Sequence, residues 1–391
     1  GFTEDWEQRK LGDLYKRVNE RNDGTLGRDK WISVAKMYFQ DPDKVQSNNL
    51  DTRTYVMKKG DIAFEGHPNN EFKFGRFVLN DIGTGIISEL FPIYRPITEY
   101  DLDFWKYAIQ LERVMAPILA KSITSSGNSS NKLDHNHFLN KELLVPNIEE
   151  QKKIGTLLSL LSKNITLHQC KLKKLNLAKK SLLQKLFPRN GSQIPGVRFK
   201  GFTDAWEQRK LGDLAEIVRG ASPRPISDSK WFDNNSDVGW LRISDVTAQD
   251  GRIQYLEQKI SKLGQDKTRV VKTPHLLLSI AATVGKPVIN YVPTGVHDGF
   301  LIFLNPKFNI LYAFWWLEIF REEWNKYGQP GSQVNLNSDL VKNQVINIPN
   351  EKEQEKISSF LEALDRIITL HQRKLERLQE VKKGLLQKMF V

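Results

Sequence analysis

The chain has 391 residues, 39% of them hydrophobic, so it is too long for one ordinary domain and too apolar for a disordered protein. Its formal net charge of +12 favours a polyanionic partner, with nucleic acid ahead of an anionic membrane surface. The single cysteine, Cys170, excludes an internal disulfide framework and fits a reducing compartment, so we expect a cytoplasmic protein.

The first element is a short segment that the chain contains twice. Residues 1–14, GFTEDWEQRKLGDL, recur at 201–214 as GFTDAWEQRKLGDL, with twelve of fourteen positions identical. Two repeats of about 200 residues indicate a duplicated domain rather than a solenoid. The chain starts at Gly1 rather than at Met, so we expect residues upstream of it.

The bodies that follow, 15–146 and 215–349, differ in sequence, but both predict a mixed α/β (α+β) fold with short strands between Gly, Asn and Pro residues. The predicted strands of the first body are 55–57, 61–64, 76–79 and 86–88. Those of the second body are 239–243, 276–280, 287–291 and 300–304. Each body also contains an aromatic helical segment, 103–119 or 310–326. No apolar window is long enough to span a membrane, so no membrane partner is expected.

A long helix is predicted after each body, over 149–187 and 352–390, because apolar residues recur there in alternating steps of three and four. The two copies match at an offset of 203 residues: ITLHQ occurs in both, and KKSLLQKLF aligns with KKGLLQKMF. Such an apolar seam must be buried, so we expect the copies to pair as a long antiparallel two-helix coiled coil. The predicted seam consists of Leu158, Leu161, Ile165, His168, Leu172, Leu175, Lys179, Leu182 and Leu186 with Leu361, Leu364, Ile368, His371, Leu375, Leu378, Lys382, Leu385 and Met389.

Each seam includes one His and one Lys at matching positions, and polar seam residues reduce stability but can fix register. A helix of 38 or so residues is ~57 Å long at ~1.5 Å per residue, so it can hold what it carries at a fixed separation. The first copy is strongly basic, which predicts a surface that faces phosphates or an acidic partner. The apolar residues outside the seam are expected to pack on the chain's own bodies or on another protein: Leu157, Leu160, Leu167 and Leu183, matched by Phe360, Ala363, Leu370 and Leu386.

These patterns divide the chain into five parts. The predicted parts are a first body at 1–148, a long helix at 149–187, a linker at 188–200, a second body at 201–351 and a second long helix at 352–391. The linker is marked by the Pro, Gly and Ser residues of PRNGSQIPG.

Motifs for catalysis are missing from the sequence. There is no GxxxxGK[ST] phosphate loop, and no Gly-rich turn with the Asn/Asp-Pro-Pro-aromatic tetrapeptide that an amino-methyltransferase needs. His135 and His137 lack a further Cys or His pair at usable spacing, so we expect no metal site. We therefore expect no catalytic residues in this chain. A stand-alone DNA-modifying enzyme and a coiled-coil scaffold without a DNA role remain alternatives.

Polar and basic side chains in loops are the candidates for DNA binding, because Arg, Asn and Gln can read base edges and other contacts to phosphate position the protein. The candidates in the first body are Lys30, Lys36, His67, Asn69, Asn70, Ser125, Ser126, Asn128 and Ser129. The candidates in the second body are Arg219, Ser222, Arg224, Arg242, Ser244, Gln333, Asn335 and Asn337.

Over essentially its whole length, the sequence resembles the specificity subunit of type I restriction-modification systems. The resemblance is carried by the duplicated WEQRKLGDL, by VPNIEEQKKI and IPNEKEQEKI at the starts of the long helices, and by GSQVNLNSDL before the second helix. RGASPRP, WLRISDV and AATVGK are typical of the target-recognition domains of this family. The first body has no clear counterpart of GASPRP or of AATVGK.

This resemblance implies two target-recognition domains that each read one half of a bipartite, asymmetric site in double-stranded DNA, with the helices setting the spacer. It also implies a non-catalytic subunit that binds two methyltransferase subunits and, through them, restriction and translocase subunits. S-adenosylmethionine, ATP and Mg²⁺ are then expected on the partner subunits, with no cofactor in this chain. The host would be a bacterium or an archaeon.

Overall fold

A computed structural model describes the chain at residues 6–45, 53–126, 130–188, 191–280, 283–327 and 336–390. The chain divides into two compact units: Gly1–Cys170 with Gln372–Val391, and Lys171–His371. Each unit therefore contains one body together with parts of both long helices. Within the described part of the chain, no helix combines the length and the apolar composition needed to cross a membrane.

The first unit consists of short strands and short helices around the ends of the long helices. Its strands are β1 (Glu7–Lys10), β2 (Tyr15–Val18), β3 (Ile32–Ser33), β4 (Tyr38–Phe39), β5 (Thr54–Met57), β6 (Ile62–Glu65), β7 (Arg76–Leu79), β8 (Gly85–Ser88), β9 (Ile93–Pro96), β10 (Ile123–Ser126), β11 (Asn131–Leu133) and β12 (Glu142–Val145). Its short helices are α1 (Leu11–Leu14), η1 (Arg28–Lys30), η2 (Pro42–Lys44), α2 (Leu102–Ala108), α3 (Glu112–Ala120) and α4 (His135–Leu139).

The second unit is built in the same way. Its strands are β13 (Glu207–Lys210), β14 (Glu216–Arg219), β15 (Gly239–Trp240), β16 (Arg252–Ile253), β17 (Arg269–Val271), β18 (Leu276–Ser279), β19 (Pro287–Asn290), β20 (Thr294–Val296), β21 (Phe300–Leu304) and β22 (Val345–Ile348). Its short helices are α6 (Leu211–Leu214), η3 (Ser229–Trp231), α7 (Ile243–Ala248), α8 (Lys262–Gln265), α9 (Ile310–Phe320), η4 (Arg321–Tyr327) and α10 (Ser338–Asn343).

The two bodies share one strand topology although their sequences differ. The first has a sheet in the order β2-β9-β6-β7 and a β5-β8 pair. The second has β14-β21-β18-β19, extended by β16, and a β17-β20 pair, extended by β15. The run from β5 to β9 therefore corresponds strand by strand to the run from β17 to β21. The antiparallel pairs β1-β12 and β13-β22 correspond as well.

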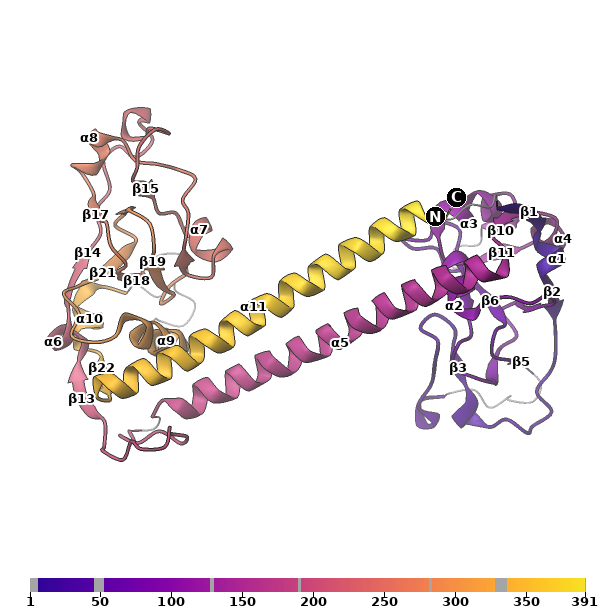
Figure 1. Cartoon of the computed structure of the whole chain (residues 1–391), viewed down its shortest axis with the longest axis horizontal. Coiled ribbons are helices and arrows are strands. Elements are labelled where there is room, and N and C mark those ends of the chain that lie inside the picture. The colour runs from indigo at the N-terminus through magenta and orange to yellow at the C-terminus, as the bar shows by residue number, and fades with distance from the viewer. Residues whose placement is uncertain are drawn as a thin grey trace. The chain divides into compact units, whose positions relative to one another are not determined.

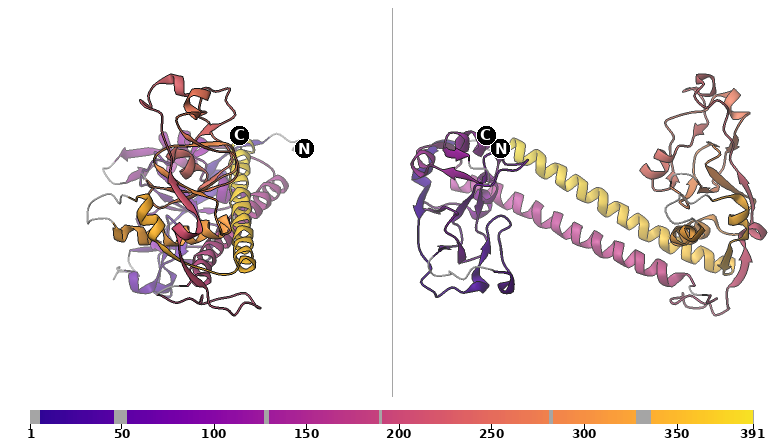
Figure 2. Two further views of the ribbon diagram at one scale, coloured as in Figure 1. Left: turned by 90° about the vertical axis from the view of Figure 1, so that its left-hand side faces the viewer. Right: turned by 180° about the vertical axis from the view of Figure 1, so that it is seen from behind.

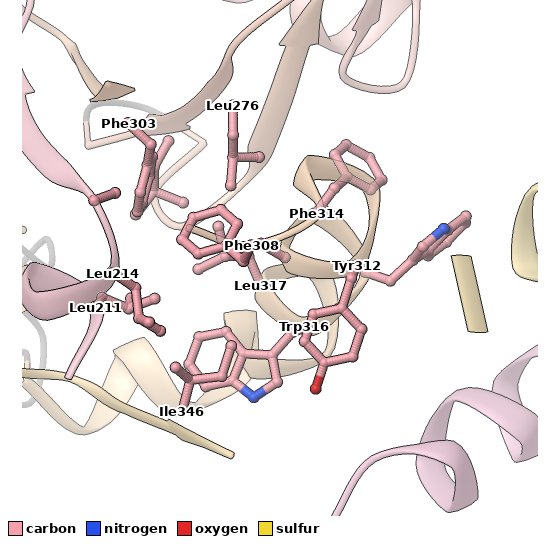
Figure 3. Packing of buried hydrophobic residues seen from close by; sticks show 14 of the residues in the cluster. Leu211, Leu214, Leu276, Phe303, Phe308, Tyr312, Phe314, Trp316, Leu317 and Ile346 are labelled. Atoms are coloured by element: carbon pink, nitrogen blue, oxygen red, sulfur yellow. The ribbon is translucent and has the colours of Figure 1, made fainter. Parts of the chain in front are cut away.

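Each central sheet is covered on both faces, which explains why inner strands such as β6 and β18 are buried along their whole length rather than on alternate residues. In the second unit, Leu276 and Phe303 belong to the core cluster around α9. Their neighbours Leu277 and Ile302 belong to a second cluster on the other face, which includes residues of β17 and β20. Figure 3 shows the first cluster, where the side chains of the sheet face Phe308 and the aromatic residues of α9.

Three predicted segments differ from the structure. The segment 103–119 forms two helices, α2 and α3, because the chain turns between them and both bury their apolar faces in one cluster. The segment 310–326 is α9 followed by the tighter η4. The strand predicted at 239–243 is shorter, because Asp245 accepts a hydrogen bond from the backbone N–H of Arg242 and caps α7.

The long helices, α5 (Ile148–Leu186) and α11 (Glu351–Lys388), pack against each other in opposite directions within each unit. In the second unit the end of α5 lies beside the beginning of α11 (Figure 1). Both helix ends contribute to one core cluster, with Leu186 from α5 and Leu361 from α11. In the first unit the beginning of α5 lies beside the end of α11 (Figure 2). Both contribute to another core cluster, with Leu158 from α5 and Leu385 from α11. The predicted mixed fold with an antiparallel two-helix coiled coil is therefore confirmed.

All eighteen predicted seam residues are buried or half-buried. The apolar residues predicted outside the seam do not all behave in the same way. Leu160, Leu167 and Leu370 are 52%, 65% and 59% exposed, so the expectation that they pack on the chain's own bodies is wrong. For them, packing on another protein stays a prediction. Leu183 and Leu386 are half-buried and do pack against the core clusters of the units.

Each long helix ends against the entry segment of the other repeat. Phe187, just beyond α5, lies edge-to-face on Trp206 with 6.3 Å between ring centroids. Phe390, just beyond α11, lies edge-to-face on Trp6 at 6.1 Å. Because such aromatic pairs are favourable beyond the area they bury, each unit is completed and stabilised by a helix end from the other half of the chain.

The two seam lysines lie over aromatic rings of the bodies. Lys179 Nζ is 4.7 Å from the centroid of Trp315 and also pairs with Asp365 on α11. At the equivalent position, Lys382 Nζ is 4.9 Å from the centroid of Tyr107. A cation over a partly desolvated ring is attracted by its π face. The two seam lysines therefore connect the coiled coil to both bodies.

Candidate nucleic-acid interface

One carboxylate holds the loop after β14, residues 220–225, against the turn before β21. The Ser222 hydroxyl donates to Asp298 Oδ1 at 2.7 Å, and the Arg224 guanidinium donates to Asp298 Oδ2 at 2.7 Å. The Arg219 Nε–H donates to the backbone carbonyl of Asp298 at 2.6 Å. Three predicted DNA-binding residues thus converge on Asp298, which sequence patterns do not single out.

The loop and the turn approach each other closely at Gly220. The Gly220 N–H donates to the Phe300 carbonyl at 2.9 Å, and the Ala221 N–H donates to the Val296 carbonyl at 3.0 Å. A Cβ on Gly220 would lie only 2.1 Å from the carbonyl oxygen of His297, so this position requires glycine. The loop and the turn therefore form one continuous surface.

Asp298 offsets part of the positive charge that Arg219 and Arg224 bring to this surface. The hydrogen bond from Ser222 and the positive charges of Arg224 and Arg219 lower the pKa of Asp298, so it is an anion at neutral pH. The Arg224 side chain is nevertheless 74% exposed. A guanidinium has five N–H donors and this contact uses one, so Arg224 keeps donors for a guanine edge or a phosphate.

Arg242 is bound by carboxylates of its own unit. Its guanidinium donates to Asp245 at 3.1 and 2.9 Å and to Glu257 at 3.2 Å. These contacts raise the pKa of Arg242 above its usual value, and the hydrogen bonds to Asp245 have the largest effect. Arg242 is half-buried, whereas Ser244 on α7 is exposed.

The third predicted loop of the second unit is described only at its end. Asn337 is the N-cap of α10, and its side-chain oxygen accepts from the Leu340 N–H at 2.9 Å. Capping satisfies a helix N–H that would otherwise have no intrahelical partner. Gln333 and Asn335 lie outside the described residues.

In the first unit the predicted residues fall in different places. Lys30 and Lys36 are exposed: Lys30 precedes β3, and Lys36 lies in the turn from β3 to β4. Lys30 Nζ is 5.5 Å from the centroid of the Phe39 ring. Of the residues predicted in the Ser-rich loop, Ser125 and Ser126 belong to β10, but their side chains are outside the described part, as are Asn128 and Ser129.

His67, Asn69 and Asn70 lie in the loop between β6 and β7 and are exposed. This loop corresponds by topology to the one between β18 and β19 that carries AATVGK, so the first body has a counterpart in space that its sequence does not show. Asn69 accepts from the backbone N–H groups of Glu71 and Phe72 at 2.8 and 3.0 Å, which orders the loop.

The first body also contains an arginine and a carboxylate that its sequence does not mark. Arg21 follows β2 as Arg224 follows β14, and Glu89 precedes β9 as Asp298 precedes β21. The Arg21 guanidinium donates to Glu89 Oε2 at 2.8 Å and lies 5.1 Å from the centroid of the Tyr55 ring. Only the shared strand topology relates the two pairs, so residue spacing could not have found them.

The histidines considered for metal binding have other contacts. Nδ1 of His135 lies 2.6 Å from the hydroxyl of Tyr94, and burial lowers the pKa of His135. His137 follows Asp134, whose side chain accepts from the His137 backbone N–H at 2.8 Å. Across the ranges that the structure describes, no group of three or more His, Cys, Asp or Glu side chains is arranged to hold a metal ion.

Comparisons with known proteins identify what this arrangement is similar to. Residues 203–380 match a family model described as the type I restriction modification DNA specificity domain. Two curated relatives come from Methanocaldococcus jannaschii. The type I restriction enzyme MjaVIII specificity subunit is 22% identical over 98% of this chain and 91% of its own length. The putative type I restriction enzyme MjaX specificity subunit is 22% identical over 98% of this chain and 92% of its own length.

Solved structures match the fold of the whole chain. The HsdS subunit from Thermoanaerobacter tengcongensis has a TM-score of 0.52 at 18% identity, covering 100% of this chain and 97% of that one. The type I restriction-modification S subunit from M. genitalium has a TM-score of 0.57 at 13% identity, covering 99% and 96%. Together, the family match and the relatives confirm the resemblance that the sequence motifs indicate.

Proposed function

We propose that this chain, a type I restriction-modification specificity subunit, reads a bipartite and asymmetric site in double-stranded DNA. The observation that carries the proposal is the duplicated body: two units share a strand topology but place different side chains in equivalent loops. Base-edge contacts depend on side chains, so one fold with two sets of loops suits two different half-sites. The second loop set includes Arg219 and Arg224, and the first includes His67 and Asn69.

In this proposal the long helices set the gap between the half-sites. The helices have 39 and 38 residues, or roughly 57 Å at ~1.5 Å per residue. At ~3.4 Å per base pair, the half-sites can be separated by no more than roughly 17 base pairs. The antiparallel packing within each unit supports two readers related by a pseudo-two-fold axis, which matches the approximate two-fold symmetry of the duplex.

We assign the chemistry to partner subunits in the cytoplasm. Two methyltransferase subunits that carry S-adenosylmethionine bind the chain, and restriction and translocase subunits that use ATP and Mg²⁺ join through them. Exposed leucines at equivalent positions of the two long helices, Leu167 and Leu370, support two similar protein partners, because apolar surface of this kind favours association.

Mapping methylated adenines in DNA from cells that carry this chain and its methyltransferase partner tests the proposal. We expect a two-part sequence with a fixed gap. Replacing the body at 15–146 by that of a relative should change one part and leave the other as it was. A single continuous motif, or a change in both parts, would contradict the assignment.

Two further measurements separate this function from its alternatives. DNA binding by the assembled complex should weaken linearly with salt on a double-logarithmic plot, because phosphate contacts release counterions. Binding that is absent or independent of salt would favour a scaffold. Robust turnover by the isolated chain with DNA, Mg²⁺, ATP and S-adenosylmethionine would favour a stand-alone enzyme.

A further inference from the structure

Both bodies place an arginine beside a carboxylate at the same point of the fold. In each, the arginine follows the first strand of the central sheet, and the carboxylate lies in the turn before the strand that pairs with it. The pairs are Arg224 with Asp298 at 2.7 Å and Arg21 with Glu89 at 2.8 Å. The bodies differ in sequence, yet the same pair of chemical groups recurs in the corresponding loop and turn.

We infer that Asp298 and Glu89 are positioning residues for DNA recognition: each binds an arginine from its own body and fixes how that guanidinium meets a base edge. The inference rests on the proposed DNA-reading function and names residues that act through Arg224 and Arg21 rather than touch DNA themselves.

Exposure and geometry support this role. The side chains of Arg224 and Arg21 are 74% and 49% exposed, while those of Asp298 and Glu89 are 34% and 32% exposed. The carboxylates therefore lie deeper than the arginines that they bind. A guanidinium is a planar fork, so a carboxylate bound to it fixes the plane in which the fork lies.

The carboxylates also act on selectivity through charge. A free arginine at an exposed loop binds any phosphate, which adds affinity without sequence information. A carboxylate beside it cancels part of the positive charge and repels phosphate. Asp298 additionally accepts from Ser222, so the loop that carries Arg224 is held in one conformation before DNA binds.

The test uses the assembled complex of the full chain with its methyltransferase subunits. Asp298→Asn should reduce discrimination about 10–100-fold at one or two base pairs of one half-site, since a bidentate arginine contact discriminates by that factor. Glu89→Gln should do the same in the other half-site. Each variant is the control for the other, because each half-site should respond to only one of them.

Salt dependence supplies a readout that loss of packing would not produce. Asp298→Asn removes a charge that repels phosphate and frees Arg224, so the salt slope of binding to non-specific DNA should steepen by roughly one. Asp266→Asn removes the same charge from an exposed position of the same unit. This matched control should leave the half-site sequence unchanged.

Arg224→Lys is a second variant that keeps the charge and leaves the Asp298 contacts with Ser222 and Arg219 in place. It should relax the same base pairs as Asp298→Asn, because lysine lacks the planar fork. The inference fails if both variants discriminate between bases in the half-site within twofold of the wild type. It also fails if Asp266→Asn reduces this discrimination equally. A wild-type complex without a bipartite site would instead overturn the proposed function.

Discussion

Two buried asparagines show how single side chains shape the bodies. Asn80 follows β7 and Asn290 ends β19, and both are fully buried. The Asn80 amide donates to the Gly83 carbonyl at 2.7 Å. The Asn290 amide donates to the Val292 carbonyl at 3.1 Å, and its oxygen accepts from the His275 N–H at 2.9 Å. Each amide therefore provides a hydrogen-bond partner for a backbone carbonyl in the turn after its strand. Buried polar groups need such partners.

Replacing Asn290 should weaken the second unit. Asn290→Ala leaves buried backbone groups without partners. We therefore expect the free energy of unfolding, measured in denaturant titrations, to fall by about 1–3 kcal/mol. Asn234→Ala, at an exposed position of the same unit, should change stability by less than about 0.5 kcal/mol. Equal effects of the two substitutions would show that the buried amide contributes nothing.

A histidine beside the DNA-binding loop should make the second unit less stable in mild acid. Burial among Trp240 and Phe300 lowers the pKa of His297, and Asp298 opposes this only in part. Its Nδ1 accepts from the Gly299 N–H at 2.9 Å, which a protonated ring cannot do. The unfolded chain therefore binds this proton at higher pH than the folded chain does. The stabilisation is present above the unfolded pKa of ~6.5 and is lost as the pH falls through the lower folded pKa.

The measurement is the melting midpoint of the second unit as a function of pH. Between about pH 7.5 and pH 5.5, His297→Gln should melt with a shallower dependence on pH than the wild type. A variant that follows the wild-type curve in parallel would assign the acid sensitivity to other groups.

For single residues, the sequence could predict which side chains lie in the seam but not which side chains they contact. The heptad spacing predicts that Lys179 and Lys382 face inward, and both are half-buried. The aromatic rings beneath them, Trp315 and Tyr107, come from α9 and α2. No periodicity within a helix carries information about rings on a different element, so these contacts could not be predicted.

At the scale of elements, strands were predictable where both faces of a sheet are buried. The runs predicted at 76–79 and 300–304 coincide with β7 and β21, because a continuous apolar run flanked by turn residues has few other solutions. Helix ends were less predictable, as the break between α2 and α3 shows. That break depends on how two apolar faces reach one core, which is a tertiary property.

The contacts at the ends of the long helices make a prediction that is specific to each unit. Phe187 is 3% exposed and Trp206 is 1% exposed. Phe187→Ala should destabilise the second unit by about 3–5 kcal/mol, because it removes a buried ring and leaves a cavity. Hydrogen exchange followed by mass spectrometry should show faster exchange in the second body and unchanged exchange in the first.

Phe390→Ala is the matched experiment and should have the reverse effect, on the first body. Leu177→Ala, at a 60% exposed position of α5, should affect neither body by more than about 0.5 kcal/mol. Faster exchange in both bodies after either aromatic substitution would show that the helix ends do not act unit by unit.

At the scale of the whole molecule, helix length should control the site that is recognised. Inserting one heptad at matched points of α5 and α11, near residues 170 and 373, keeps the seam in phase. Seven residues add ~10.5 Å, so the gap should grow by roughly three base pairs while both half-sites stay the same. Methylation-site mapping is the measurement, and an altered half-site would contradict a spacing role for the helices.

The internal repeat and its 203-residue offset could be predicted from the sequence, since identical segments such as ITLHQ recur. The similarity between the folds of the two bodies could not be predicted. It lies in the order of hydrogen-bonded strands, while the residues in their loops have diverged. The pairing of Arg21 with Glu89 follows from that order, and so it became visible only in three dimensions.

Each unit is completed by a helix end from the other half of the chain, and this has a consequence for synthesis of the chain. The first unit needs the segment that begins at Gln372, which the ribosome adds about 200 residues after Cys170. At a synthesis rate of ~5–20 residues per second, the apolar site around Trp6 therefore stays uncovered for roughly 10–40 s. The first body is thus translated before the second but completed after it, and during that interval it has the greater need of a chaperone.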